Sequence, residues 1–265
     1  MRMMSIASGS SGNAIYAGSD TTHLLLDAGI SKKRIEEGLN SIGLSVSDLS
    51  GVLISHEHSD HISSLCTILK SCSANVYATK DTIDAMFRMK AFAKADRERF
   101  IAVEKGRKFG IGDMDITPFA IPHDAADPVM YTVAYGKVKG AVATDLGEYD
   151  EGIVNALKGL DAIYLEANHD VRMLQTGPYP YILKQRILGR RGHLSNETAG
   201  RLLSKILCDK TSHVFLSHLS KENNLPMLAH EAVRLEVNMA DTPYTDRDFD
   251  LQVAKRDEPS ECIEL

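Results

Sequence analysis

Three histidines and an aspartate stand close together in the run His56-Glu57-His58-Ser59-Asp60-His61. Neutral imidazole nitrogens and carboxylate oxygens are the donors that zinc, manganese and iron take in proteins. Side chains alternate in direction along an extended segment, so His56 and His58 point to one side, whereas Asp60 and His61 must turn toward a second position. An ordinary polar loop would rarely gather three of the chain's ten histidines in this way. The run predicts a metal site built for two ions.

Three further residues of ligand type each follow an apolar segment that predicts a strand: His123, Asp145 and His218. Short loops at strand ends bring positions that are distant in sequence together. Any one of the three alone would more often be an ordinary polar loop residue. In a chain that already carries the histidine run, the three together predict additional ligands for the same ions.

The composition excludes several classes of protein. With 265 residues, 43% of them hydrophobic, the chain can bury a substantial core. No charged-then-apolar leader begins it, and no apolar run approaches the roughly 20 residues of a membrane span, so we expect a soluble, cytoplasmic protein without a membrane segment. The four cysteines are scattered, which predicts reduced thiols rather than a disulfide framework or a zinc ribbon.

Charge is distributed unevenly along the chain, whose formal net charge is -6. Arg172 to Lys205 holds seven Lys or Arg residues against one Glu, a local charge of +6, whereas Glu231 to Leu265 holds ten acids against four Lys or Arg, a local charge of -6. A charged segment is most often a solvated surface. A basic segment near candidate metal ligands also suits a phosphate-bearing substrate.

Strands and helices alternate in both halves of the chain. We expect strands at 3–8, 14–17, 23–27, 52–55, 75–78, 107–110, 114–121, 130–135, 140–144, 162–166 and 214–216. We expect helices at 31–42, 61–71, 80–95, 151–158, within 171–207 and at 226–237, with Ser31 and Ser195 as N-caps and Pro226 in a first turn. No linker separates domains. The pattern predicts one α/β domain over 1–265, in which two mixed sheets pack face to face with helices outside, an αββα arrangement.

The order of these polar residues, with Asp27 preceding them, resembles that of the metallo-β-lactamase superfamily over nearly the whole chain. The resemblance implies an αββα sandwich with a dinuclear metal site at one edge. At the matching positions, His56, His58 and His123 would bind the first ion. The second ion would be bound by Asp60, His61 and His218, and Asp145 would bridge the two.

Asp27 would orient the ligand loop rather than bind a metal. One departure from the family pattern is Ser64, because many members have glycine three positions after the last histidine of the motif. Two divalent ions, zinc or manganese foremost and iron also suitable, can share a water and lower its pKa from 15.7 toward ~7. We therefore expect a metal-bridging hydroxide as the nucleophile of a hydrolase, with Asp60 or Asp145 accepting a proton.

Four segments resemble the YycJ/WalJ subfamily more closely: 8–13, 166–170, 190–197 and 216–224. That resemblance implies a 5′-to-3′ exonuclease acting on double-stranded DNA and a link to a two-component regulatory system of the cell wall. His193 could protonate the leaving oxygen or hold a phosphate. The residues expected to contact substrate phosphate are Ser10, Asn13, His169, Arg190, Arg191 and His193. Asp145 and His218 are only 73 positions apart, too few for a β-CASP insertion.

Other functions stay open at this point. A hydrolase of small esters, thioesters or lactones would use the same metals with a closed apolar pocket, and a cyclic-phosphodiester hydrolase would use them without an extended basic surface. A low-turnover regulatory partner in cell-wall signalling could bind through the acidic C-terminal region. Such a partner would not need seven ligands around an open dinuclear site, so the sequence favours the DNA phosphodiesterase.

Overall fold

The computed structural model describes residues 1–265, which contain two seven-stranded sheets and outer helices. The first sheet contains β1 (Arg2–Ala7), β2 (Ala14–Gly18), β3 (His23–Leu26), β4 (Gly51–Leu53), β5 (Asn75–Thr79), β6 (Phe100–Val103) and β14 (Ile263–Glu264). The second contains β7 (Phe109–Ile111), β8 (Met114–Ala120), β9 (Val129–Tyr135), β10 (Val138–Ala143), β11 (Ala162–Glu166), β12 (His213–Ser217) and β13 (Asp250–Val253). Their strand orders are β14-β1-β2-β3-β4-β5-β6 and β13-β12-β11-β10-β9-β8-β7. These two mixed sheets confirm the expected α/β sandwich class.

The chain divides into two compact units, which we describe separately. The first unit comprises Met1–Ala120, Ala125–Val138 and Lys255–Leu265, and the second comprises Ile121–Asp124 and Lys139–Ala254. The helices of the first unit are α1 (Lys32–Asn40), α2 (Ser59–Ile62), α3 (Leu65–Ile68) and α4 (Lys80–Arg88). Those of the second unit are α5 (Glu151–Ala156), α6 (Val171–Thr176), α7 (Tyr181–Leu188), α8 (Asn196–Ile206) and α9 (Pro226–Met239). The expectation of a single domain over 1–265 stays a prediction.

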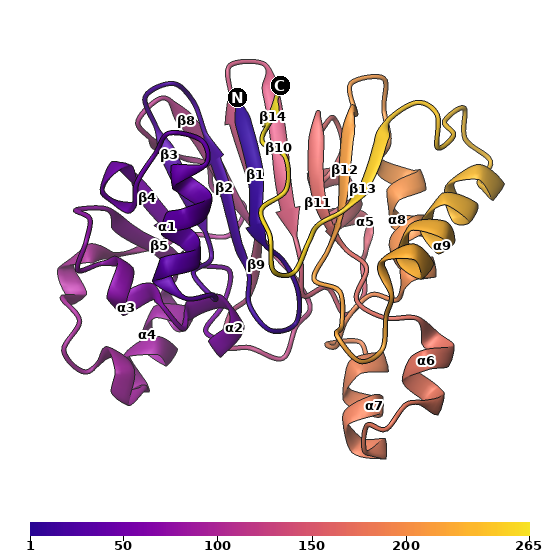
Figure 1. Ribbon diagram of the computed structural model, residues 1–265, viewed down its shortest axis with the longest axis horizontal. Helices are drawn as coiled ribbons and strands as arrows, with labels where there is room; N and C mark the ends of the chain where they lie inside the picture. Colours follow the sequence, from indigo (N-terminus) through magenta and orange to yellow (C-terminus); the bar gives the residue numbers. More distant parts are fainter. The chain divides into compact units, whose positions relative to one another are not determined.

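In the first unit, the two sheets meet through their apolar faces. Tyr131 on β9 donates its hydroxyl to the carbonyl oxygens of Ile54 (3.0 Å) and Tyr77 (3.2 Å). The ring of Tyr77 also stacks on that of Phe109 at 5.4 Å. Figure 1 shows α1 along the first sheet, where its buried residue Leu39 joins the core. β3, β4, β5 and β6 are parallel, so their carboxyl ends lie at one edge of the sheet.

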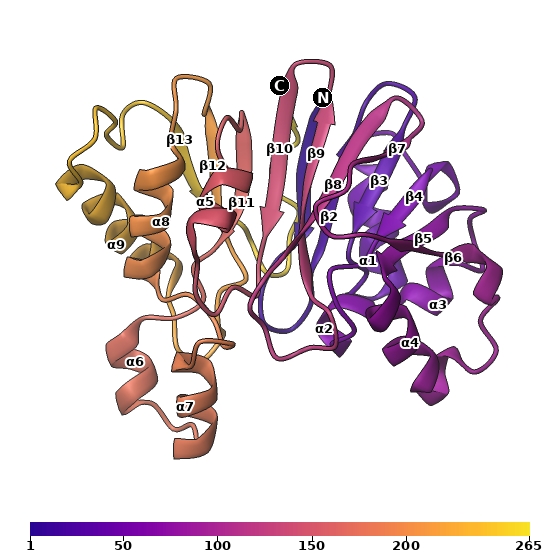
Figure 2. The same ribbon diagram turned by 180° about the vertical axis from the view of Figure 1, so that it is seen from behind.

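In the second unit, β10, β11, β12 and β13 are parallel. Every residue of β11 is buried, as expected for a strand covered on both faces. The rings of Tyr164 and Phe215 stack at 4.7 Å in this core. Figure 2 shows α5 and α8 beside the strands of this unit, while α6 and α7 form a pair that extends away from them. The carboxyl ends of β10, β11 and β12 again share one edge.

Most of the expected elements are confirmed, including the Ser31 and Ser195 caps and Pro226 at the start of α9. The helix expected at 61–71 is wrong, because it is interrupted at Ser64. The backbone N–H and the hydroxyl of Ser64 both donate to the Ala28 carbonyl oxygen, each at 3.0 Å. Ser64 therefore separates α2 from α3. Its bonds also hold the ligand loop (residues 56–61) against the end of β3.

Other boundaries also differ. The helix expected to run to Ala95 ends at Arg88, where Met89 adopts an extended backbone. β6, β13 and β14 were not expected, since these short edge strands contain many exposed or half-buried residues and lack a clear apolar alternation. None of the helices has the length and apolar character that crossing a membrane requires.

Replacing Gly29 with alanine is expected to destabilise the first unit. A Cβ at this position would lie 1.6 Å from the carbonyl oxygen of Asp60, whereas at Gly110 the nearest atom would be 3.8 Å away. We expect Gly29→Ala to lower the free energy of unfolding by about 3 kcal/mol, because the ligand loop would have to move. Urea denaturation measures this, with Gly110→Ala as the matched control. Equal midpoints for the two variants would contradict the close packing of this loop.

Candidate metal centre

One group of ligand-type side chains, the histidine cluster, lies in the first unit, on the segment from β4 to α2 and in α2 itself. It consists of His56, His58, Asp60 and His61. The ring centroid of His56 lies 4.5 Å from that of His58 and 4.2 Å from that of His61. His56 and His61 are fully buried, whereas His58 and Asp60 are half-buried. The four residues predicted from the sequence as ligands on this loop are therefore brought together.

Asp27, at the end of β3, fixes the orientation of this cluster. Its Oδ1 accepts the Ser55 backbone N–H at 2.9 Å, and its Oδ2 lies 2.7 Å from Nδ1 of His61. A proton on Nδ1 that is donated to this carboxylate leaves the lone pair of His61 on Nε2, the atom that would bind a metal. Nε2 of His61 lies 3.4 Å from Oδ2 of Asp60. This geometry supports the orienting role expected for Asp27.

Asn13 also contacts the histidine cluster. Its side-chain amide nitrogen lies 3.3 Å from Nε2 of His61, and its backbone N–H donates to the Asp60 carbonyl oxygen at 2.9 Å. Its side-chain oxygen accepts the Gly9 N–H at 3.0 Å. Asn13 is buried and Ser10 is exposed on the same loop. Of these two residues predicted to bind phosphate, Asn13 thus holds the ligand loop in place.

A second group, the Asp145 cluster, lies in the second unit and consists of His123, Asp145 and His218. Oδ1 of Asp145 lies 3.6 Å from Nε2 of His123, and Oδ2 lies 3.2 Å from Nδ1 of His218. The two carboxylate oxygens therefore face different histidines. All three residues are buried. This arrangement suits an aspartate that shares its two oxygens between two cations.

Glu166, which was not predicted as a site residue, organises the second unit's cluster. This fully buried carboxylate ends β11. Its Oε1 accepts the Asp145 N–H at 3.2 Å and contacts Nδ1 of His193 at 2.9 Å. Its Oε2 accepts the N–H groups of Leu146 (2.8 Å) and Leu194 (3.0 Å). Four such partners satisfy a buried carboxylate, so Glu166 positions the neighbouring loops. The sequence signal was an acid that ends an entirely apolar strand.

His193, which the sequence predicted to act on the substrate, lies beside the Asp145 cluster. Its ring centroid lies 5.2 Å from that of His123 and 5.3 Å from that of His218. Burial disfavours the imidazolium, but the Glu166 carboxylate, followed by Asp145, outweighs burial and raises the pKa of His193 to about 9. A pKa above neutrality favours the imidazolium form of His193, the form that can donate a proton.

His123 is held from two sides in the form that a metal needs. Burial lowers its pKa, which keeps the imidazole neutral, and its Nδ1 lies 3.2 Å from the Gly192 carbonyl oxygen. Its own carbonyl oxygen accepts two bonds from the Arg191 guanidinium, at 3.0 and 2.7 Å. Arg191, predicted to bind phosphate, thus supports the backbone of a candidate ligand.

Most of the other basic side chains in residues 172–205 also bind to groups of the protein itself. Arg190 makes an ion pair with Glu148 at 2.8 Å, and Arg186 is paired with Asp124. Lys184 donates to two carbonyl oxygens, and Arg201 pairs with Glu236 at 3.1 Å. His169, the last predicted substrate residue, is buried three positions beyond the end of β11. Three of the seven cations in 172–205 therefore have acidic partners, which lowers the net charge that this segment presents.

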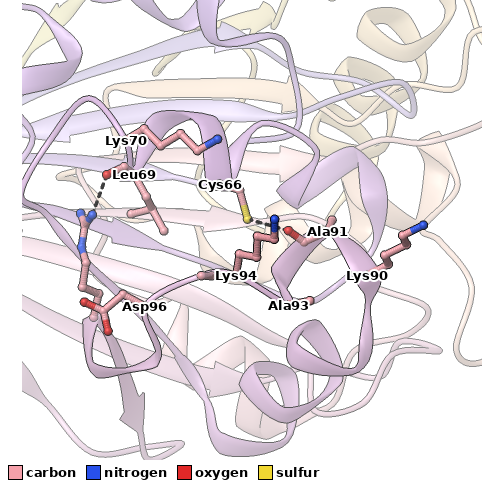
Figure 3. Close-up of a pocket in the computed structure, with 10 residues that line it drawn as sticks. Cys66, Leu69, Lys70, Lys90, Ala91, Ala93, Lys94 and Asp96 are labelled. Atoms are coloured by element: carbon pink, nitrogen blue, oxygen red, sulfur yellow. Dashed lines mark hydrogen bonds between the residues drawn. The ribbon is translucent and has the colours of Figure 1, made fainter.

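The first unit contains a cavity that is separate from the histidine cluster (Figure 3). It encloses about 480 Å³ and is lined by Cys66, Leu69 and the lysines Lys70, Lys90 and Lys94, among others. Cys66 donates its thiol to the Ala91 carbonyl oxygen at 3.5 Å, and burial raises its pKa. The thiol therefore stays protonated, and the cavity offers neither a nucleophile nor histidine ligands.

The donor chemistry of both clusters fits divalent metal ions. In the second unit, Asp145, Glu166, His193 and His218 offer ligand-type atoms within 4.8 Å of one another. Because Glu166 is saturated with hydrogen bonds, Asp145 and His218 are the natural ligands there. In the first unit, the imidazoles of the histidine cluster are oriented by carboxylate and hydroxyl partners, as at protein metal sites.

Comparisons with known proteins agree with this chemistry. A model of the β-lactamase superfamily domain matches residues 22–219. Exodeoxyribonuclease YycJ of Bacillus anthracis is 38% identical over 228 residues, which cover 86% of this chain and 86% of its own. Exodeoxyribonuclease WalJ of Streptococcus pneumoniae is 38% identical over 236 residues, covering 89% of this chain and 88% of its own. Zinc-bound PqqB of Methylobacterium extorquens shares the fold, with a TM-score of 0.71, 16% identity and coverage of 98% and 100%.

Replacing Asp27 with asparagine is expected to weaken metal binding. An amide nitrogen facing Nδ1 of His61 would favour the tautomer that protonates Nε2, the proposed ligand atom. We expect metal affinity to fall about 10–100-fold, measured by competition with a chelating indicator dye. Asp20→Asn, on an exposed loop of the same unit, is the control. Unchanged affinity in a folded Asp27→Asn protein would argue against the orienting role.

Proposed function

The chain belongs to the β-lactamase superfamily, and from this membership we propose that it is a DNA 5′-to-3′ exonuclease with a dinuclear metal centre. Its fold and its relatives make it a metal-dependent hydrolase. The observation that carries the chemistry is the Asp145 carboxylate between His123 and His218, beside the His193 imidazolium. DNA as substrate follows from the names of the two exodeoxyribonuclease relatives.

In this proposal the metal ligands are the seven residues that the family pattern implies. His56, His58 and His123 would hold one ion, and Asp60, His61 and His218 the other, with Asp145 as the shared ligand. Zinc and manganese are the preferred candidates, because imidazole and carboxylate ligands suit both. When bound, the ions would lower the pKa of a water and stabilise the charge that develops on the phosphoryl oxygens.

His193 would act on the leaving oxygen. A phosphodiester releases an alkoxide, which needs a proton, and His193 carries one at neutral pH because Glu166 raises its pKa to about 9. The same imidazolium could instead stabilise a non-bridging oxygen. In either role, Glu166 orients the ring through Nδ1 and thereby leaves Nε2–H to face the substrate.

One observation favours a second candidate, a hydrolase of small phosphodiesters. Arg186, Arg190 and Arg201 are all engaged by acidic side chains of the protein itself, so a long cationic groove for duplex DNA is not evident.

A cytoplasmic location and a functional link to a two-component regulatory system stay predictions. We infer the cytoplasm from the proposed DNA substrate and from four free cysteines.

Removing metal is expected to abolish DNA cleavage. The purified protein is incubated with end-labelled duplex DNA after chelation, and then with zinc or manganese restored. We expect mononucleotides released from the 5′ end only with metal present, and none from an Asp60→Ala/His61→Ala variant, which lacks two proposed ligands. Brisk turnover of a cyclic phosphodiester or thioester without DNA cleavage would favour the smaller substrates.

Replacing Glu166 with glutamine is expected to lower kcat about 100-fold or more, because His193 would lose the carboxylate that keeps it protonated and oriented. Metal content and the thermal midpoint are measured in parallel, so that loss of the site is separated from loss of proton donation. Glu151→Gln, at the exposed start of α5, should behave like the wild type. Full activity of Glu166→Gln would remove His193 from the proposed mechanism.

A further inference from the structure

A cavity of about 560 Å³ lies in the second unit beside the Asp145 cluster. We call it the α6–α8 cavity. The residues that line it include His169, Arg172, His193, Ser195, Glu197 and Leu188. His193 is shared with the proposed catalytic site, whereas Arg172 and Glu197 have no part in it. The volume is in the range of pockets that hold a small organic ligand.

His169 points to an occupant of this cavity. The residue is 1% exposed, and both ring nitrogens are buried without a hydrogen-bond partner. Its backbone is fixed, since its carbonyl oxygen accepts the Asn196 N–H at 3.0 Å. Burial lowers the pKa of His169 to about 4, so the ring is neutral and offers one donor and one acceptor. Unpaired buried polar groups of this kind are costly unless a ligand or water satisfies them.

Glu197, in the first turn of α8, presents a second unsatisfied group. Its Oε2 is buried and has no hydrogen-bond partner. A carboxylate in the lining disfavours a bare phosphate or sulfate as the occupant, because like charges would repel. It favours a ligand that can donate an N–H, such as the amino group of a nucleobase.

Arg172 supplies a positive charge at the same cavity. It is exposed on α6, and no acidic side chain pairs with it. Among the cations of the basic segment it differs in this respect from Arg186, Arg190 and Arg201, which have acidic partners. Val171 and Leu188 add apolar surface to the lining. The cavity thus combines a cation, apolar contact, a carboxylate and a neutral imidazole.

We propose that the α6–α8 cavity binds one nucleotide of the DNA strand, with the base against His169 and Glu197 and the phosphate near Arg172. The inference rests on the proposed function, and it names the feature by which the enzyme holds a nucleotide next to the one being cut. A neutral imidazole can both donate to and accept from a base edge, and the Glu197 carboxylate accepts from an exocyclic amino group. Thymine lacks that group, so cytosine should bind better.

Calorimetric titration of the purified protein with dCMP and with dTMP tests this assignment. We expect dCMP to bind about tenfold more tightly than dTMP, because the thymine complex leaves the Glu197 carboxylate unpaired. Glu197→Gln should remove most of this difference. Arg172→Gln should weaken both nucleotides about equally but leave deoxycytidine, which has no phosphate, unaffected. Arg247→Gln, another exposed arginine of this unit, is the matched control.

Two outcomes would overturn the inference: no saturable binding of dCMP, or binding that neither Glu197→Gln nor Arg172→Gln changes while both variants melt like the wild type. Failure of the proposed function is distinguishable from these. Metal-dependent DNA cleavage without these nucleotide effects would leave the exonuclease and discard the cavity. Selective dCMP binding without DNA cleavage would keep the cavity as a nucleotide site and discard the exonuclease.

Discussion

Three residues adopt a left-handed backbone without being glycine: Asp27 (φ 62°), Asp145 (φ 62°) and His218 (φ 56°). Each follows a strand and turns the chain across the edge of its sheet, and each belongs to the pattern that indicated the metal site. Such a conformation costs of order 1–2 kcal/mol for a residue with a side chain. It persists only where neighbouring groups over-determine it, so much of the local structure exists to hold these three turns.

In both units, a buried carboxylate helps to hold these left-handed turns in place. In the first, Asp27 binds Ser55 and His61. In the second, Glu166 binds the N–H of Asp145, and two residues further along Asn168 donates its amide to the His218 carbonyl oxygen at 2.9 Å. Removing one partner of a buried charge costs about 3–5 kcal/mol. The loops that carry the proposed ligands are therefore coupled to the stability of the sheet edges.

The sequence predicted the parts of this arrangement that depend on local spacing. Runs such as 56–61 and single polar residues after apolar strands are visible without a structure. Glu166 was missed because its role depends on β11 lying between β10 and β12, an adjacency that no local pattern encodes. Ser64 was recognised as a departure, but its bonds to Ala28 depend on the parallel pairing of β3 with β4. The fold class was thus predictable, and an orienting role for Asp27 was expected from the sequence, whereas the contacts of Glu166 and Ser64 could be recognised only in the folded chain.

Net charge was the least reliable guide, because counting residues ignores pairing. Arg186, Arg190 and Arg201 have acidic partners, and Arg191 supports the His123 backbone. An ion pair has almost no net charge, so Arg186, Arg190 and Arg201 contribute little field at a distance. Salt screens the field of the remaining exposed cations beyond about 8–10 Å. Affinity for a nucleic acid would then come from a few short-range contacts near the Asp145 cluster. A protein of net charge -6 can engage a polyanion on these terms, because local geometry outweighs the overall repulsion.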